Sequence, residues 1–262
     1  MSPIGLVGLL LVFVGTFVGG LMKGVSPVFL FSIPAAFLIV VGGAVGASLM
    51  SLDDASGKHF IKYIMKALKK NKVPSFVAAI EEFSRLADIA RRSGALALEQ
   101  EVVNITDPFM KKGIQMIVDG SDHDQLEAAL GLETAAMKDR HKNGAKLMLQ
   151  VGIFSPTFGI IGAVFGLIAT LSNLNDPAKL GHGISAAFVA TFWGVFLANG
   201  LFLPWSNRLG VYSTEEGRYR ALVIEGCVAI QSGKSPREIP DILEGFLTPA
   251  QRLVLRGEGT KK

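Results

Sequence analysis

The side chains that most often carry catalytic or metal-binding chemistry are scattered through this sequence. The four histidines lie far apart, and the single cysteine, Cys227, excludes both a disulfide framework and a multi-cysteine metal site. No HExxH, CxxC or GxSxG pattern occurs. Gly233-Lys234-Ser235 resembles the end of a phosphate-binding loop, but Val228 stands where that motif requires its first glycine. We therefore expect no enzyme active site, no cofactor and no metal centre.

Neutral polar side chains inside long apolar stretches are the more informative group. Four stretches contain no Asp, Glu, Lys or Arg, namely 1–22, 24–52, 147–175 and 180–207. They offer only hydroxyl and amide groups such as Thr16, Ser155, Thr191 and Asn199. Proton and cation pathways through a membrane usually include an ionisable side chain. If this chain helps to conduct an ion, the titrating carboxylate must come from a partner.

The composition of the 262 residues is that of a membrane protein. It is 50% hydrophobic and 18% charged, below the quarter that is usual in soluble domains. Because about 20 apolar residues span the hydrocarbon core as a helix, we predict an all-α integral membrane protein. Its four transmembrane helices should lie near 4–22, 28–50, 149–172 and 184–205. The net charge of +4 is too small and too dispersed to indicate nucleic-acid binding.

Basic residues predict the orientation of these helices. Lys and Arg number 15 between 51 and 147 and 9 after 207, whereas the two short hairpins carry only Lys23 and Lys179. Since basic loops stay in the cytoplasm, both termini and the large loop should be cytoplasmic. We expect four parts in chain order. Two membrane helices lie in 1–50, a cytoplasmic helical domain covers 51–147, two more membrane helices lie in 148–206, and a helical cytoplasmic tail covers 207–262. The first segment lacks the basic start of a signal peptide, so we expect it to stay as an anchor.

Residues 58–70 predict a basic amphipathic helix just below the membrane. Ile61, Ile64, Met65 and Leu68 should share one face, with lysines on the other. Contact with anionic headgroups and an ordinary solvated charged face both fit this pattern.

Further helices are expected in the cytoplasmic parts. We predict helices over 74–92 and 95–104, separated by Gly94, and one over 124–131 capped by Asp122. A helix from Thr134 should continue into the third membrane segment. The fourth segment should continue past Arg208 toward Ile230, and Thr248-Pro249 should start a last short helix.

Small residues at helical spacing occur in all four membrane segments. The first three segments each have a pair of glycines, namely Gly15 with Gly19, Gly42 with Gly46, and Gly162 with Gly166. The fourth segment has a stripe of Ala186, Ala190, Gly194 and Ala198. They favour close helix packing, either within the chain or between subunits. Pro156 and Pro204 each remove an internal hydrogen bond, which produces either a hinge or a static kink.

Several motifs together resemble the MotA/PomA family, the larger subunit of the bacterial flagellar stator. They cover nearly the whole chain and comprise Ala87–Glu99 (ADIARRSGALALE), Val118-Asp119-Gly120 with Asp139-Arg140-His141, Pro156–Leu167, Ile184–Thr191 through Pro204, and Ala229–Pro236. The resemblance implies a ring of five such chains around two copies of a MotB/PomB-type subunit. That partner has one membrane helix with an ion-carrying Asp and a domain that binds peptidoglycan, and ion flow turns the ring against the rotor.

The resemblance also implies a set of rotor-contact residues. By motif position, Arg91 and Glu99, with Arg92 as an accessory, meet the rotor protein FliG. On one continuous helix, Arg91 and Glu99 would lie about 12 Å apart and about 80° around the axis from each other. Gln100 stands where the family often has a second acid, which argues against an extended acidic patch.

The ion-pathway residues follow from the same resemblance. Pro156 and Pro204 match two prolines tied to coupling, and Thr191 matches a threonine beside the ion path. Sodium-driven members carry a second threonine where Ala163 stands, and losing that hydroxyl removes an oxygen ligand for Na⁺. We therefore predict proton coupling.

Two alternatives remain. ExbB/TolQ-like proteins drive envelope transport, but they have one helix before the large loop, whereas two precede it here. A membrane scaffold or self-sufficient channel is the second alternative, against which the missing intramembrane carboxylate argues.

Overall fold

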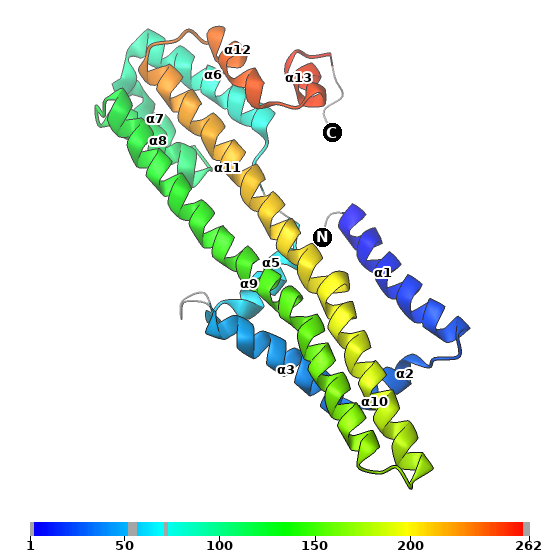
Figure 1. Ribbon diagram of the computed structural model, residues 1–262. Helices are drawn as coiled ribbons and strands as arrows, with labels where there is room; N and C mark the ends of the chain where they lie inside the picture. The colour runs from blue at the N-terminus through cyan, green and yellow to red at the C-terminus, as the bar shows by residue number, and fades with distance from the viewer. Residues whose placement is uncertain (1–2, 52–56, 71–72, 259–262) are drawn as a thin grey trace. The chain divides into compact units, whose positions relative to one another are not determined.

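The computed structural model describes residues 3–51, 57–70 and 73–258. Every regular element in these ranges is a helix, as the sequence predicts (Figure 1). The chain forms two compact units, one of residues 1–71 with 140–211 and one of 72–139 with 212–262. Both chain ends, which we expect in the cytoplasm, lie outside the described residues.

The first unit contains the apolar helices. Its elements are α1 (Pro3–Met22), α2 (Pro27–Phe31), α3 (Pro34–Met50), α5 (Phe60–Leu68), the second part of α9 (His123–Leu171), α10 (Pro177–Phe196), the π-helical turn η2 (Leu197–Phe202) and the start of α11 (Leu203–Gln231). Three helical stretches of the described residues are long and apolar enough to cross a bilayer: Pro3–Met22, His123–Leu171 and Pro177–Gln231.

The predicted second membrane segment, 28–50, is not one helix. α2 ends at Phe31, and Ile33 has a non-helical backbone (φ −115°, ψ 76°) before Pro34 starts α3. Proline lacks an N–H and restricts the residue before it, so the helix cannot continue through this point. The 17 residues of α3 extend about 25 Å, slightly less than the hydrocarbon core of about 30 Å.

α9 is one helix of 49 residues, so the separate helix predicted over 124–131 is wrong. Asp122 does cap its start, because the backbone N–H of Gln125 donates to the Asp122 carboxylate at 2.8 Å. Nothing between Leu130 and Thr134 interrupts the helix. Pro156 lies inside it without ending it.

α9 and α10 pack with their backbones in direct contact through glycines, and Figure 1 shows α10 running beside the second half of α9. A methyl group at Gly194 would lie 2.7 Å from the Ser155 carbonyl oxygen, and one at Gly166 would lie 2.7 Å from that of Gly183. Small residues permit this approach where the lipid offers no hydrophobic drive for association. The predicted stripes of the third and fourth segments thus pack within the chain. Methyl groups at Gly15 and Gly19 of α1 would meet nothing within 4 Å among the described residues.

Trp193 fastens α2 to α10. Its indole N–H donates to the Leu30 carbonyl at 2.9 Å, and its ring makes edge contacts with Phe31 and Phe37. Trp193 is buried with its nitrogen satisfied, as a large amphipathic side chain requires. This contact holds the short helix that replaces the start of the predicted second segment.

α5 packs on α9 through a face that differs in part from the predicted one. Phe60, Tyr63 and Ile64 pack against the core of the first unit, and Ala67 is fully buried. Tyr63 lies over Gly144, where a methyl group would be 2.6 Å from its ring. Lys66 Nζ also lies 2.9 Å from His141 Nε2.

The second unit is a helical domain with its own core. Its elements are α6 (Phe76–Ser93), the 3-10 turn η1 (Ala95–Leu98), α7 (Glu99–Val102), α8 (Pro108–Val118), the first part of α9, most of α11, α12 (Glu238–Leu243), the 3-10 turn η3 (Glu244–Phe246) and α13 (Pro249–Leu255). Ile80, Phe83 and Leu86 of α6 are fully buried, and Phe83 lies over Gly226 of α11.

Helix ends in this unit follow the predicted signals closely. Ser75 caps α6, accepting from the Ala78 N–H, and Gly94 ends it. The predicted helix over 95–104 is a 3-10 turn followed by one turn of α7. α11 continues to Gln231 as predicted. Thr248 forms a capping box with Gln251 at the start of α13, which confirms the Thr248-Pro249 signal.

The glycine contact predicts a sharp cost for one added methyl group. Gly166→Ala would place Cβ 2.7 Å from the Gly183 oxygen and 2.8 Å from the Ala187 nitrogen, both backbone atoms. We expect a loss of about 1–3 kcal/mol, because a backbone cannot give way as a side chain does. Thermal unfolding of the purified protein in detergent measures it.

The matched control is Gly131→Ala, in the same helix, where a methyl group meets nothing within 4 Å. Alanine favours a helix over glycine by up to about 1 kcal/mol, so this variant should be at least as stable as the parent. Equal unfolding temperatures for the two variants would contradict the packing described for α9 and α10.

Candidate functional site

Arg91, Arg92 and Glu99 are exposed, but they do not share a helix. α6 ends at Ser93 and Gly94 has φ +84°, a backbone region that favours glycine. The separation expected for one continuous helix therefore does not apply. Arg91 and Arg92 lie in the last turn of α6 and Glu99 in the first turn of α7. Each charge thus sits at the helix end whose dipole it complements.

The three charges differ in how far they are engaged. Arg92 forms a two-point contact with Asp88, with Nε and Nη2 at 3.0 and 2.9 Å from its oxygens, although the Arg92 side chain stays 75% exposed. Among the described residues no ion pair involves Arg91 or Glu99. These two therefore keep most of their capacity to attract a partner of opposite charge.

A hollow of about 380 Å³ lies beside Arg91. Lys234, Gln231 and Ser121 also line it. The pKa of Glu238 is lowered mainly by the hydrogen bond from the Ser235 N–H, and the positive charge of Arg91 adds a smaller effect. The basic side of the candidate contact surface is thus continuous with the start of α12.

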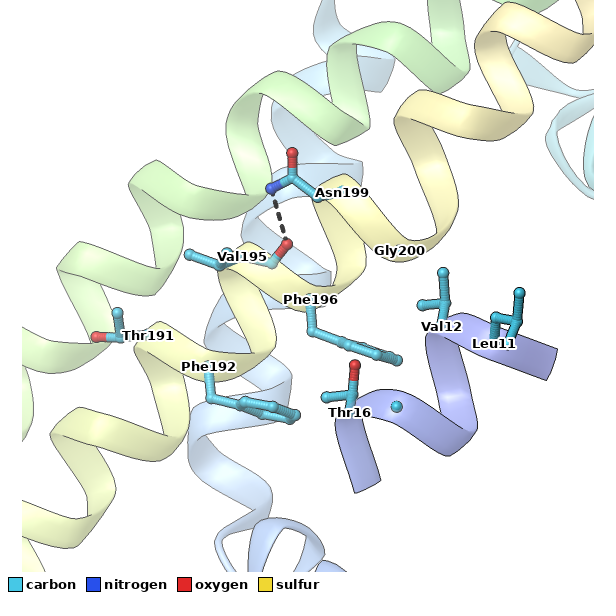
Figure 2. A pocket seen from close by; sticks show the side chains of 10 residues that line it. Leu11, Val12, Thr16, Thr191, Phe192, Val195, Phe196, Asn199 and Gly200 are labelled. Atoms are coloured by element: carbon cyan, nitrogen blue, oxygen red, sulfur yellow. Dashed lines mark hydrogen bonds between the residues drawn. The ribbon is translucent and has the colours of Figure 1, made fainter. Parts of the chain in front are cut away.

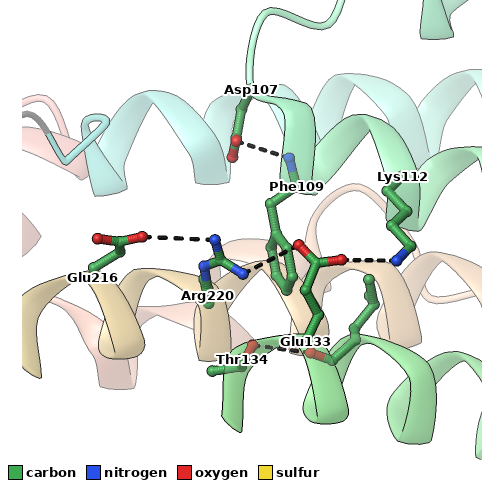
Figure 3. Close-up of polar contacts among 8 residues, drawn as sticks. Asp107, Phe109, Lys112, Glu133, Thr134, Glu216 and Arg220 are labelled. Atoms are coloured by element: carbon green, nitrogen blue, oxygen red, sulfur yellow. Dashed lines mark hydrogen bonds and ion pairs between the residues drawn. The ribbon is translucent and has the colours of Figure 1, made fainter. Parts of the chain in front are cut away.

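A network of ion pairs joins three other helices of the second unit, α8, α9 and α11 (Figure 3). Glu133 of α9 accepts from Lys112 Nζ at 2.7 Å and from Arg220 Nη1 at 3.3 Å. Arg220 also lies 3.6 Å from Glu216 and stacks 4.4 Å from the Phe109 ring centre. The hydrogen bond from Lys112 holds the pKa of Glu133 below its ordinary value. One carboxylate thereby joins α8, α9 and α11.

Asp107 makes a second junction in this unit. Its carboxylate caps α8 by accepting from the Phe109 N–H at 3.0 Å and accepts from the Tyr219 hydroxyl at 2.8 Å. Burial, together with this bond, raises the pKa of Tyr219, and burial raises that of Cys227. Both groups are therefore neutral at physiological pH and act as structural members of the core.

The Glu133 network predicts an acid-dependent loss of stability. A carboxyl whose pKa is lowered by folding stabilises the fold above its unfolded pKa, and this contribution disappears as the pH falls through the lowered value. In Glu133→Gln the loss of stability below about pH 4 should be smaller than in the parent, and stability at pH 7 should be lower. Denaturant unfolding at pH 7 and at about pH 3, below the ordinary carboxyl pKa, measures both effects.

Glu127→Gln is the control, since Glu127 is exposed and, among the described residues, its one ion pair is with His123 of the same helix, at 3.5 Å. It should leave the pH dependence of the parent unchanged. If Glu133→Gln and the parent lose stability in parallel on acidification, Glu133 is not the junction described.

The four predicted ion-pathway residues all lie in the first unit. Pro156 and Ala163 are on α9, Thr191 on α10, and Pro204 near the start of α11. A methyl group at Gly194 would approach the Pro156 Cα to 3.2 Å, and one at Gly159 would approach the Thr191 Cα to 3.5 Å. The structure thus places Pro156 and Thr191 on two sides of one close helix contact. The Thr191 hydroxyl donates to the Ala187 carbonyl at 3.0 Å.

A groove of about 550 Å³ runs between α1 and α10. Figure 2 shows Phe192 and Phe196 pointing toward α1, whereas Thr191 and Asn199 lie along the adjacent side of α10 and η2. Every residue that lines the groove is neutral. It can therefore provide hydroxyl and amide oxygens to an ion path but no group that takes up and releases a proton.

The π-helical turn η2 is a feature that the sequence analysis missed. It joins α10 to α11 just before Pro204, and the amide of Asn199 in this turn donates to the Val195 carbonyl of α10 at 3.1 Å (Figure 2). π turns are rare and occur frequently at functional sites. The local signal was limited to Pro204 itself, because a π turn has no residue pattern of its own.

Comparison with known proteins decides the family. Residues 4–94 match the motility protein A N-terminal family, and residues 101–221 match the MotA/TolQ/ExbB proton channel family. A motility protein A from Bacillus subtilis (strain 168) is 38% identical over 259 residues, covering 99% of this chain and 96% of that protein. The chain belongs to the motility protein A family. The resemblance that the motifs indicated is therefore confirmed.

Solved structures of family members agree with this fold. MotAB from C. jejuni matches with a TM-score of 0.89 at 30% identity, covering 95% of this chain and 97% of that one. The flagellar MotAB stator complex from Bacillus subtilis matches with a TM-score of 0.88 at 38% identity, covering 96% and 98%. The family is a stator and channel family rather than a known class of enzyme. The roles of the seven site residues stay predictions.

Proposed function

We propose that this chain is the stator subunit of a bacterial flagellar motor, which works with a MotB-type partner to couple ion flow to torque. The whole-chain similarity to MotAB stator complexes is the observation that carries this proposal. The match of residues 4–94 to the motility protein A N-terminal family favours the stator over an ExbB/TolQ-like role.

A partner is needed on chemical grounds as well. The four charge-free stretches contain no carboxylate, and the groove between α1 and α10 is lined by neutral residues. A MotB-type helix with an ion-carrying Asp would supply the missing titrating group. The proposed assembly is a ring of five copies of this chain around two copies of that partner.

The proposed topology has four spans in the cytoplasmic membrane, with both termini and the second unit on the cytoplasmic side. α3, an apolar helix of 17 residues, would be the span that length alone does not identify. α2 would lie at the outer interface, attached by the bond from Trp193. The distribution of Lys and Arg supports this orientation.

Ion passage and helix movement would meet at the contact of α9 with α10. Thr191 would line the path, and Pro156 lies at the same contact, against Gly194. A change in the charge of the partner's carboxylate would then act where two backbones touch without intervening side chains. The adjacent part of the helix, which contains η2 and Pro204, has fewer regular backbone hydrogen bonds. Ala163 offers no oxygen ligand, so the proposed ion is H⁺.

Torque would be exerted through Arg91 and Glu99, with Arg92 as an accessory, on FliG. Exposed charges without strong intramolecular partners speed association and fix the relative position of two surfaces more than they increase affinity. The two charges at separate helix ends would give the rotor one positive and one negative contact. Because Arg92 already pairs with Asp88, it would contribute less to the rotor contact than Arg91.

Charge reversal tests the rotor contact. In a flagellated host that lacks stators but supplies the cognate partner, Arg91→Glu and Glu99→Lys should each reduce swimming while the complex still assembles. The exposed Lys111 lies in the same unit on α8, not on the helices that carry these residues, so Lys111→Glu is the matched control. It should swim like the parent. Swimming that is unchanged in both test variants would remove Arg91 and Glu99 from the contact.

Ion replacement tests the coupling. Swimming driven by this complex should persist when Na⁺ is replaced by K⁺ at constant proton motive force, and it should stop when a protonophore collapses that force. The physical reason is that Ala163 cannot complete an oxygen cage for Na⁺. Arrest on sodium removal would refute proton coupling while leaving the stator assignment in place.

A further inference from the structure

One face of α5 is exposed and combines lysines with apolar side chains. Ile61, Lys62 and Met65 lie at the spacing of a single face of α5, Lys58 lies in the turn just before the helix, and all four are exposed. Ile61 is 74% exposed and Met65 47%. The opposite face, with Tyr63 and Ala67, packs on the first unit. α5 is therefore held in place by one side and presents a mixed basic and apolar stripe on the other.

The contact with α9 places this stripe near the level at which the membrane begins. Tyr63 lies over Gly144, three residues before the charge-free stretch that starts at Leu147. Three residues of helix rise about 4.5 Å. The headgroup layer on each side of the hydrocarbon core is about 5–8 Å thick. In the proposed topology, this contact places α5 at headgroup depth.

The segment that contains α5 carries only basic charges. Residues 55–80 contain no Asp or Glu, whereas Lys58, Lys62 and Lys70 are exposed there. A protein surface opposite this stripe would need to supply carboxylates for the lysines and an apolar patch for Ile61 and Met65. An anionic lipid leaflet supplies both, because phosphate groups and acyl chains lie within a few ångströms of each other.

We propose that the stripe of Lys58, Ile61, Lys62 and Met65 is a binding site for anionic phospholipid headgroups of the cytoplasmic leaflet. Lys58 and Lys62 contact the phosphates, and Ile61 and Met65 enter the boundary of the acyl chains. Since α5 is fixed to α9, bound lipid holds this part of the first unit against the bilayer surface. The proposal concerns lipid contact and does not depend on the motor role of the chain.

The test uses the complex of this chain with its partner, purified in a mild detergent. Phosphatidylglycerol or phosphatidylcholine is titrated in, and retained lipid is counted by native mass spectrometry. We expect preference for phosphatidylglycerol, weakened by salt. Each lysine near an anionic surface contributes about fivefold in affinity, so Lys58→Gln with Lys62→Gln should weaken phosphatidylglycerol binding about 25-fold. Phosphatidylcholine binding should not change.

Lys111→Gln with Lys138→Gln is the control with the same loss of charge on exposed lysines of the second unit. It should keep the affinity of the parent for phosphatidylglycerol. Equal loss in both double variants would mean that overall charge, not this stripe, binds the lipid, and the proposal would fail. If the ring of the Lys58→Gln and Lys62→Gln double variant dissociates with or without lipid, the stripe contacts a neighbouring copy of the chain instead. That result would also overturn the proposal.

A second measurement does not require the lysine variants to assemble. The Ile61→Cys variant is labelled with a nitroxide, and its complex is reconstituted into vesicles of phosphatidylcholine with phosphatidylglycerol. The native Cys227 is fully buried and should not be labelled. The label should be relaxed more by oxygen than by a water-soluble nickel complex. The reverse order would place Ile61 in water and refute insertion of the stripe.

Discussion

The backbone contact between α9 and α10 is the constraint on which the rest of the first unit depends. Within a bilayer, apolar side chains gain little by leaving lipid for protein, so helix association relies on close packing. Gly159, Gly166 and Gly194 remove the side chains that would keep the two backbones apart. The contact brings Pro156 and Thr191, which lie on different helices, to one place. A larger residue at any of these glycines would push the two helices apart, and Pro156 and Thr191 with them, before it altered any polar group.

The same contact accounts for the irregular segment beside it. α10 is held against α9 up to Gly194, and Leu203 of α11 again lies against α9, where a methyl group at Gly152 would be 2.7 Å from it. Between these two fixed points the chain accommodates its length through the π turn η2. Asn199 satisfies a carbonyl there, and Pro204 follows without an N–H to donate. A segment with irregular backbone bonding thus adjoins the proposed ion path.

Much of this fold was predictable because strong local signals decide it. Charge-free stretches marked the apolar helices, and Ser75, Gly94 and Thr248 marked helix ends where the structure has them. The predictions failed where tertiary packing or one residue outweighed composition. Pro34 divides an apolar run that hydropathy reads as continuous, and α9 continues through 124–134 because core residues such as Leu126 and Leu130 bury that stretch. The π turn left no signal beyond Pro204.

The candidate site divides in the same way between what spacing can predict and what it cannot. Family motifs located Arg91 and Glu99, and Gly94 ends the helix between them, as the sequence predicts, but the direction in which Gly94 (φ +84°) turns the chain cannot be read from spacing. Two helix ends then carry the two charges, each stabilised by its own dipole. Because the Glu133 network joins α8, α9 and α11 while the α6 core packs on α11, these ends are mounted on a rigid frame. If this surface contacts a rotor as proposed, such a frame would transmit force, since a compliant one would absorb displacement instead.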